Sequence, residues 1–164
     1  MPIYQINSPP FKPPHKMTSS IPRPAATIQS LDHLVLTVKS ISASKEWYTK
    51  NLGMKHESFV SASTPDITRH SLIFGTQKIN LHECGKEFEP KALQVQPGSA
   101  DLCFLTTDPV KEVRKRLIEA KVEIVDLRGE GNGLGLGEGI VVRTGARGRL
   151  ASVYCRDLDG NLIE

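Results

Sequence analysis

The sequence predicts an α+β fold in which two tandem βαβββ modules form a curved mixed sheet around a cavity. Two observations lead to this prediction. The same order of elements, a strand, a helix and three strands, can be traced twice along the 164 residues. Polar side chains also occur at equivalent places in the first and last strands of each half, among apolar neighbours. Because buried polar groups need partners, we expect these side chains to face a common cavity.

Residues 1–26 are predicted to be a disordered, proline-rich tail, and residues 27–164 a folded domain. The tail holds seven of the eleven prolines, which fix φ and lack a backbone donor. It also holds three basic residues and no acidic one, so the remaining basic and acidic groups balance at 18 each. A neutral domain has no broad surface for phosphate backbones, and we expect no nucleic-acid partner. The tail itself could be an interaction segment or, despite its prolines, an organellar presequence.

The expected compartment is the cytoplasm. No apolar run is long enough to span a bilayer, and no signal peptide opens the chain, so we expect neither a membrane partner nor secretion. Three widely spaced cysteines, Cys84, Cys103 and Cys155, fit a reducing compartment and small residues in or near the core.

The first module is predicted at about residues 28–88. Its first strand, 31–38, is apolar and branched, and it carries His33 near its start. The serines of the stretch 40–44 are candidate N-caps for the following helix, and Gly53 suits the left-handed position after its end. Three further strands are predicted at 55–60, 70–74 and 78–83.

The second module is predicted at about residues 99–164. A strand at 100–105 precedes a helix that we expect to begin with Asp108 as N-cap and Pro109 at its first position. Further strands are predicted at 122–127, 140–144, 150–155 and 162–164. Residues 129–139 contain six glycines but no phosphate-loop motif, which favours a flexible insert.

Equivalent positions in the two modules carry polar residues. When 31–36 is set over 99–104, His33 falls on Asp101, and the last strand ends in Glu164. Each residue alone has an ordinary structural explanation, a hydrogen-bonded histidine for His33, for example. Together, an imidazole and carboxylates are best satisfied around a divalent cation, so the shared cavity is predicted to be a metal cavity.

At this point the chain resembles the vicinal oxygen chelate superfamily, which includes glyoxalase I, fosfomycin-resistance thiol transferases, extradiol dioxygenases and bleomycin-resistance proteins. Within it, the chain is most similar to the glyoxalase domain-containing protein 5 type. The resemblance covers about residues 28–164. The matching stretches are 31–38, 47–54, 77–83, 87–91, 97–103, 143–146 and 152–164.

The resemblance implies a metal site and a substrate site. The implied metal ligands are His33, Asp101 and Glu164, with His82 as an alternative imidazole. The implied substrate residues are Asn80, Ser152, Tyr154 and Arg143, and the implied catalytic residues are Glu164 and Tyr154. Many relatives have a second histidine where this chain has Asp101, and this harder donor set favours Mn²⁺ or Mg²⁺, with Zn²⁺ and Ni²⁺ as alternatives. Relatives continue the last strand beyond the position of Glu164, so a truncated strand and a terminal carboxylate beside the metal are both open.

The expected function is therefore a metal-dependent, glyoxalase-like isomerase or lyase that acts on a small substrate with vicinal oxygens. Thiol transfer, with glutathione as co-substrate, is the second form of this hypothesis. Arg143 and Arg147 would favour an anionic ligand, unless they are solvated loop charges. The alternative function is a binding protein of the bleomycin-resistance type, without catalysis. We expect a homodimer in either case.

Overall fold

The computed structural model describes residues 24–62, 64–127 and 139–164, which belong to two units. Residues 24–30 lie in the first unit, are exposed and have no regular secondary structure. The second unit, Leu31–Glu164, contains the helices and strands. Most of the predicted tail and the glycine-rich stretch up to residue 138 lie outside the described residues.

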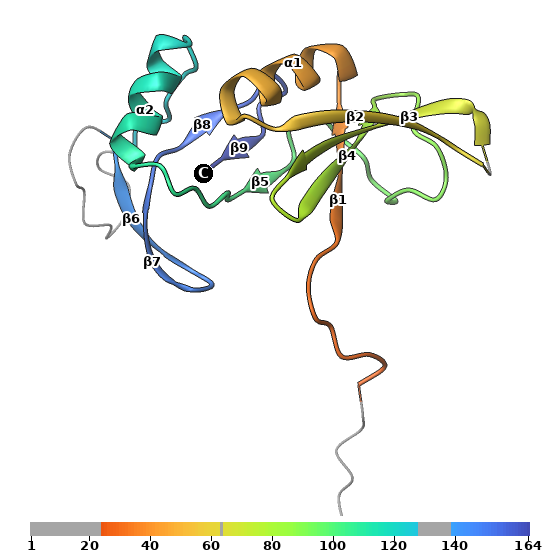
Figure 1. The fold of residues 1–164 in the computed structure, drawn as a ribbon, viewed down its shortest axis with the longest axis horizontal. Coiled ribbons are helices and arrows are strands. Elements are labelled where there is room, and N and C mark those ends of the chain that lie inside the picture. Colours follow the sequence, from red (N-terminus) through yellow and green to blue (C-terminus); the bar gives the residue numbers. More distant parts are fainter. Residues whose placement is uncertain (1–23, 63, 128–138) are drawn as a thin grey trace, which may run out of the picture. The chain divides into compact units, whose positions relative to one another are not determined.

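The first module forms a four-stranded mixed sheet. Its strands are β1 (His33–Val38), β2 (Lys55–Ser61), β3 (Thr64–Phe74) and β4 (Gln77–Glu83), in the order β1-β4-β3-β2. β1 runs parallel to β4, and the other neighbours are antiparallel. The helix α1 (Ile41–Leu52) lies along one face of this sheet (Figure 1). The predicted βαβββ order is therefore present, with β3 longer than expected.

Local sequence signals fix both ends of α1. The Ser40 side chain accepts a hydrogen bond from the Ala43 amide at 3.3 Å, as predicted for an N-cap. Gly53 has φ of 67°, and its N–H donates to the Thr49 carbonyl at 3.2 Å. The buried face of α1 packs on the apolar face of the sheet, and their joint core includes Leu36, Val38, Trp47, Tyr48, Leu72, Ile79 and Leu81.

The second module also has a strand and a helix followed by further strands, but its strands are shorter and four of them, not three, follow the helix in the described part of the chain. Its elements are β5 (Asp101–Leu102), α2 (Val110–Glu119), β6 (Val141–Gly145), β7 (Gly148–Ser152), β8 (Cys155–Arg156) and β9 (Leu162–Ile163). β5 runs parallel to β9, β8 is antiparallel to β9, and β6 and β7 form a separate hairpin.

Three predicted elements of the second module differ from the structure. The strand expected at 100–105 is paired only over β5, and the strand expected at 150–155 is divided between β7 and β8. The segment 122–127 contributes a single bridge, Ile124 to Cys155. The Val125 amide donates to the Tyr154 carbonyl at 2.8 Å, which is a hydrogen bond of this bridge.

The start of α2 also differs from the prediction. Pro109, with φ of −57° and ψ of 126°, occupies the N-cap position and makes no side-chain capping bond. The Asp108 carboxylate instead accepts a hydrogen bond from the Arg116 guanidinium at 2.5 Å. The Asp108 amide donates to Thr106 Oγ1, which turns this residue away from the helix end.

The α+β class and its mixed sheets are thus as predicted. Neither described helix has the length and apolarity needed to cross a bilayer.

Candidate functional site

The face of the four-stranded sheet that points away from α1 is polar. In the β1–β4 register, His33 lies opposite Lys78, Val35 opposite Asn80, and Thr37 opposite His82. Side chains of paired residues share a face, so His33, Asn80 and His82 all belong to this polar face. Ser71 on β3 donates its hydroxyl hydrogen to Asn80 Oδ1 at 2.8 Å.

The two histidines of this face lie in different surroundings. The His33 side chain is 41% exposed, and its Nδ1 lies 2.6 Å from Asp32 Oδ1. This hydrogen bond lowers the pKa of Asp32. His82 is buried, and its ring centroid lies 4.1 Å from that of Phe88. His33 and His82 are four residue pairs apart, about 13 Å along the strands, so the structure does not bring them together.

In the second module, Glu164 is surrounded by hydrogen-bond donors. Ser152 Oγ donates to Glu164 Oε1 at 2.5 Å, and the Cys103 thiol and the Tyr154 hydroxyl lie near enough for the charge of Glu164 to act on both. Desolvation, and then the charge of Glu164, raise the pKa of Cys103 to about 11 and raise the pKa of Tyr154. The Arg143 guanidinium lies 5.9 Å from the Tyr154 ring centroid. Four of the predicted site residues therefore form one cluster.

Asp101 lies beside this cluster at the start of β5 and is exposed. It is paired with Leu162 on β9, and the Glu164 amide donates to the Leu102 carbonyl at 2.8 Å. Asp101 and Glu164 therefore point to the same side of two adjacent parallel strands. Glu164 lies two residues beyond Leu162, the residue that is paired with Asp101. Cys103 was expected in or near the core, but it is exposed and lies within reach of the charge of Glu164. Cys84 is likewise exposed, and Cys155 is buried as expected.

The carboxylate pair is the part of the predicted ligand set that one copy of the chain brings together. Among the described residues, no three histidine, cysteine, aspartate or glutamate side chains are grouped so that they could hold a metal ion. His33 starts β1 of one sheet, whereas Asp101 and Glu164 lie on the β5–β9 pair of another. The donor types suit a hard divalent cation, but one copy does not assemble them.

A cavity of about 810 Å³ opens beside Glu164. Apolar side chains from the end of α1, from α2 and from the two modules' strands make most of its wall, with Cys103, Ser152 and Glu164 among its polar groups. Apolar wall residues include Met54, Phe74, Phe104, Val113, Leu117 and Ile163. Its volume lies in the range of small-molecule sites. Of the residues expected to face a shared cavity, Glu164 and Ser152 line this one, whereas His33 and Asp101 do not. Its apolar wall could not be predicted, because it comes from segments far apart in the chain.

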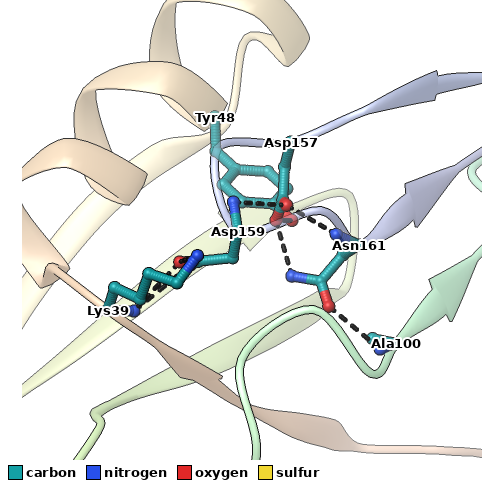
Figure 2. A network of polar contacts seen from close by, with 6 residues as sticks. All are labelled: Lys39, Tyr48, Ala100, Asp157, Asp159 and Asn161. Carbon is teal, nitrogen blue, oxygen red and sulfur yellow. Dashed lines mark hydrogen bonds and ion pairs between the residues drawn. The ribbon is translucent and has the colours of Figure 1, made fainter.

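A five-residue turn, 157–161, precedes β9 and connects several parts of the second unit (Figure 2). Asp157 accepts hydrogen bonds from the Tyr48 hydroxyl at 2.8 Å and from Asn161 Nδ2 at 2.7 Å. Asn161 Oδ1 accepts the Ala100 amide at 2.9 Å, and Asp159 accepts the Lys39 amide at 3.2 Å. The turn therefore fixes the strand that leads to Glu164.

The lowered pKa values of His56 and His82 predict how the free energy of unfolding depends on pH. Burial is the main cause that lowers the pKa of His82, and burial and then Lys45 lower that of His56, whose Nε2 lies 3.1 Å from His70 Nδ1. The unfolded chain therefore binds more protons near the ordinary histidine pKa of about 6.5, and the free energy of unfolding should fall as pH drops from 7.5 to 5.5. Urea denaturation in half-unit pH steps measures this, and a double His56→Gln, His82→Gln variant should show a flatter profile. A wild-type profile that is flat or rises toward pH 5.5 would contradict it.

Comparison with known proteins gives one consistent family. A family model described as Glyoxalase/Bleomycin resistance protein/Dioxygenase superfamily matches residues 30–164. The chain is 47% identical over 137 residues to virulence protein STM3117 of Salmonella typhimurium, covering 84% of this chain and 83% of that protein. It is 45% identical over 138 residues to glyoxalase domain-containing protein RDO1 of Mycosarcoma maydis, covering 84% and 68%.

Solved structures agree with this result. The crystal structure of STM3117 superposes with a TM-score of 0.69 at 44% identity, covering 84% of this chain and 95% of that chain. The fosfomycin resistance protein FosX of Listeria monocytogenes superposes with a TM-score of 0.50 at 15% identity, covering 84% and 90%. The FosX likeness concerns the fold alone.

Proposed function

Because this chain belongs to the glyoxalase/bleomycin resistance protein/dioxygenase superfamily, we propose that it is a metal-dependent isomerase or lyase for a small substrate with vicinal oxygens. The observation that carries the proposal is the pair of carboxylates Asp101 and Glu164 on one side of adjacent parallel strands. Glu164 also accepts a hydrogen bond from Ser152, which holds one of its oxygens before a substrate arrives.

The proposed cation would be held by His33, Asp101 and Glu164. When bound, such a cation polarises a substrate oxygen and stabilises negative charge that develops on it. The FosX structure was determined with Mn(II) and dihydroxypropylphosphonic acid, which makes Mn²⁺ the first metal to test. His82 would stay outside this set, since it is buried under Phe88 on another part of the polar face.

The proposal includes a homodimer in which His33 comes from the second copy. Support for this comes from the separation of the donors within one chain. The polar face that carries His33 also presents Val35 and Phe59, which are 45% and 43% exposed. Apolar side chains of this size on an open sheet face suit a surface that a partner covers.

The protein's own residues would handle the proton and orient the substrate. Glu164 would take the proton from the hydroxyl-bearing carbon next to a carbonyl and return it to the carbonyl carbon, while the hydroxyl proton passes to the former carbonyl oxygen, which is the isomerase reaction. Ser152 and Tyr154 would donate hydrogen bonds to substrate oxygens. Asn80 would contact the part of the substrate that lies against β4. Arg143, beside Tyr154, would meet an anionic substrate group.

Two finer alternatives belong to the same proposal. The positive charges of Arg143 and of the exposed Arg147 would favour an anionic ligand, which is compatible with thiol transfer that uses glutathione as co-substrate. The mostly apolar cavity favours a second candidate function, a binding protein without a metal. Similarity to the glyoxalase domain-containing protein 5 type and a cytoplasmic location are also proposals.

The first test is metal-dependent thermal unfolding of chelator-treated protein. A hundredfold excess of Mn²⁺ over its Kd should raise Tm by about 5–10 °C, because binding to the folded state alone adds stability. His33→Ala and Glu164→Gln should each remove most of this shift, and His56→Gln should keep it. A Tm that ignores Mn²⁺, Mg²⁺, Zn²⁺ and Ni²⁺ would favour the binding protein instead.

The origin of His33 has its own test. In a random mixture of His33→Ala and Glu164→Ala chains, each mixed dimer would contain one site with all ligands intact. The mixture should therefore recover about one quarter of the wild-type metal sites, although each variant alone has none. If the mixture binds no more metal than the separate variants, the ligands do not come from two copies.

A further inference from the structure

We propose that the 157–161 turn is a positioning element for the metal ligands, and that Asn161 is its principal residue. This inference rests on the proposed function, because it concerns how Asp101 and Glu164 are held relative to each other. No residue of the turn belongs to the proposed ligand set. The side chains of the turn instead contact backbone amides next to the strands that carry the ligands (Figure 2).

Asn161 sets the register between β5 and β9. Its Oδ1 accepts the Ala100 amide at 2.9 Å, and the next residue, Leu162, donates its amide to the Ala100 carbonyl at 3.0 Å. Both backbone groups of Ala100 are thus bonded to consecutive residues of the other strand. Ala100 directly precedes Asp101, so this contact determines how far along β9 the Glu164 carboxylate stands from the Asp101 carboxylate.

The Asn161 side chain is itself held rigidly. It is fully buried, and its Nδ2 donates to Asp157 Oδ2 at 2.7 Å. The backbone N–H of Asn161 donates to Asp157 Oδ1 at 2.8 Å. The carbonyl oxygen is therefore oriented toward Ala100. A side chain with no freedom to rotate can fix a strand register to within the fraction of an ångström that a metal site requires.

The same turn contacts the segment that follows β1. The Lys39 amide donates to both oxygens of Asp159, at 3.2 and 3.3 Å, and Lys39 comes directly after the strand that begins with His33. Within each copy, one turn thus connects the strands of all three proposed ligands. Because His33 of one copy would serve the site of the other, this contact would connect the two metal sites of the proposed dimer.

The test separates positioning from stability by measuring Mn²⁺ affinity by calorimetry at 10 °C, on variants whose circular dichroism at that temperature matches the wild type. Asn161→Ala removes the acceptor for the Ala100 amide, and Ala100→Pro removes the amide itself; each should weaken Mn²⁺ binding by about tenfold or more. Tyr48→Phe removes a hydrogen bond to Asp157 Oδ2, the oxygen that also accepts Asn161 Nδ2, but leaves the bond between Asn161 and Ala100 in place. It should lower Tm but leave the Mn²⁺ Kd within about twofold of the wild type.

The outcomes distinguish this inference from the proposed function. A wild-type protein that binds no Mn²⁺ refutes the proposed function, and the inference with it. A wild-type protein that binds Mn²⁺, with Asn161→Ala and Ala100→Pro unchanged in affinity, overturns the inference alone. Equal losses in Tyr48→Phe and Asn161→Ala would also overturn it, since affinity would then follow general stability. If Asn161→Ala does not fold, Ala100→Pro decides the question.

Discussion

Replacement of Asp157 by alanine should lower the free energy of unfolding by about 3–5 kcal/mol, because it removes a buried carboxylate from the centre of a polar network. That carboxylate accepts four hydrogen bonds, from the Tyr48 hydroxyl, from Asn161 Nδ2 and from the amides of Asp159 and Asn161. Burial raises the pKa of Tyr48 far above its ordinary value, so the hydroxyl keeps its proton and would lose its acceptor. Urea denaturation at pH 7.5 measures the effect.

A matched control is Asp108→Ala. The Asp108 carboxylate is also paired, with Arg116, but both side chains are about half exposed. An exposed ion pair contributes about 0–1 kcal/mol, so this variant should unfold close to the wild type. If Asp157→Ala and Asp108→Ala unfold within 1 kcal/mol of each other, the 157–161 turn does not stabilise the unit as argued.

The first module could be predicted closely because its signals are local. The cap at Ser40, the left-handed glycine at position 53 and the apolar periodicity of α1 each act within one or two turns of helix. The strands of its sheet alternate between a buried face and a polar face, a pattern that is readable without knowing the partner strand.

The second module depended more on contacts that sequence cannot reveal. The segment expected as a strand at 122–127 pairs only through the Ile124–Cys155 bridge, and the strand expected at 150–155 is divided because Ser152 pairs with Val141 on β6 whereas Cys155 pairs with Ile163 on β9. Asp108 had the chemistry of an N-cap, but it binds Arg116, eight residues away. In both cases a tertiary partner competes with the local preference.

The residue types of the candidate site could be predicted from the sequence, but their contacts in space could be predicted only in part. The repeat placed Asp101 at the position of His33, and the alternation of strand residues placed Ser152 and Tyr154 on one side of their strand. The hydrogen bond between Tyr48 and Asp157 joins residues 109 positions apart, and nothing in either local sequence indicates it. The same holds for the apolar cavity beside Glu164.

Gly98 gives the second large prediction, because it stands against the 157–161 turn. Its φ is +77°, and a Cβ atom built there would lie 2.5 Å from the backbone carbonyl oxygen of Asp159. Gly98→Ala should therefore combine backbone strain with a clash against main chain that cannot rotate away, and lower the free energy of unfolding by about 3–4 kcal/mol.

Gly85 separates the two parts of this effect. Its φ of +81° is nearly the same, but a Cβ there would meet no atom within 4 Å. Gly85→Ala should cost only the strain, about 1 kcal/mol, when both variants are compared by urea denaturation under identical conditions. The difference between the two variants measures how firmly the Asp159 carbonyl is held. Because Asp159 also accepts the Lys39 amide, a small difference would mean that the turn yields to the new methyl group, and a turn that yields could not fix the strand leading to Glu164.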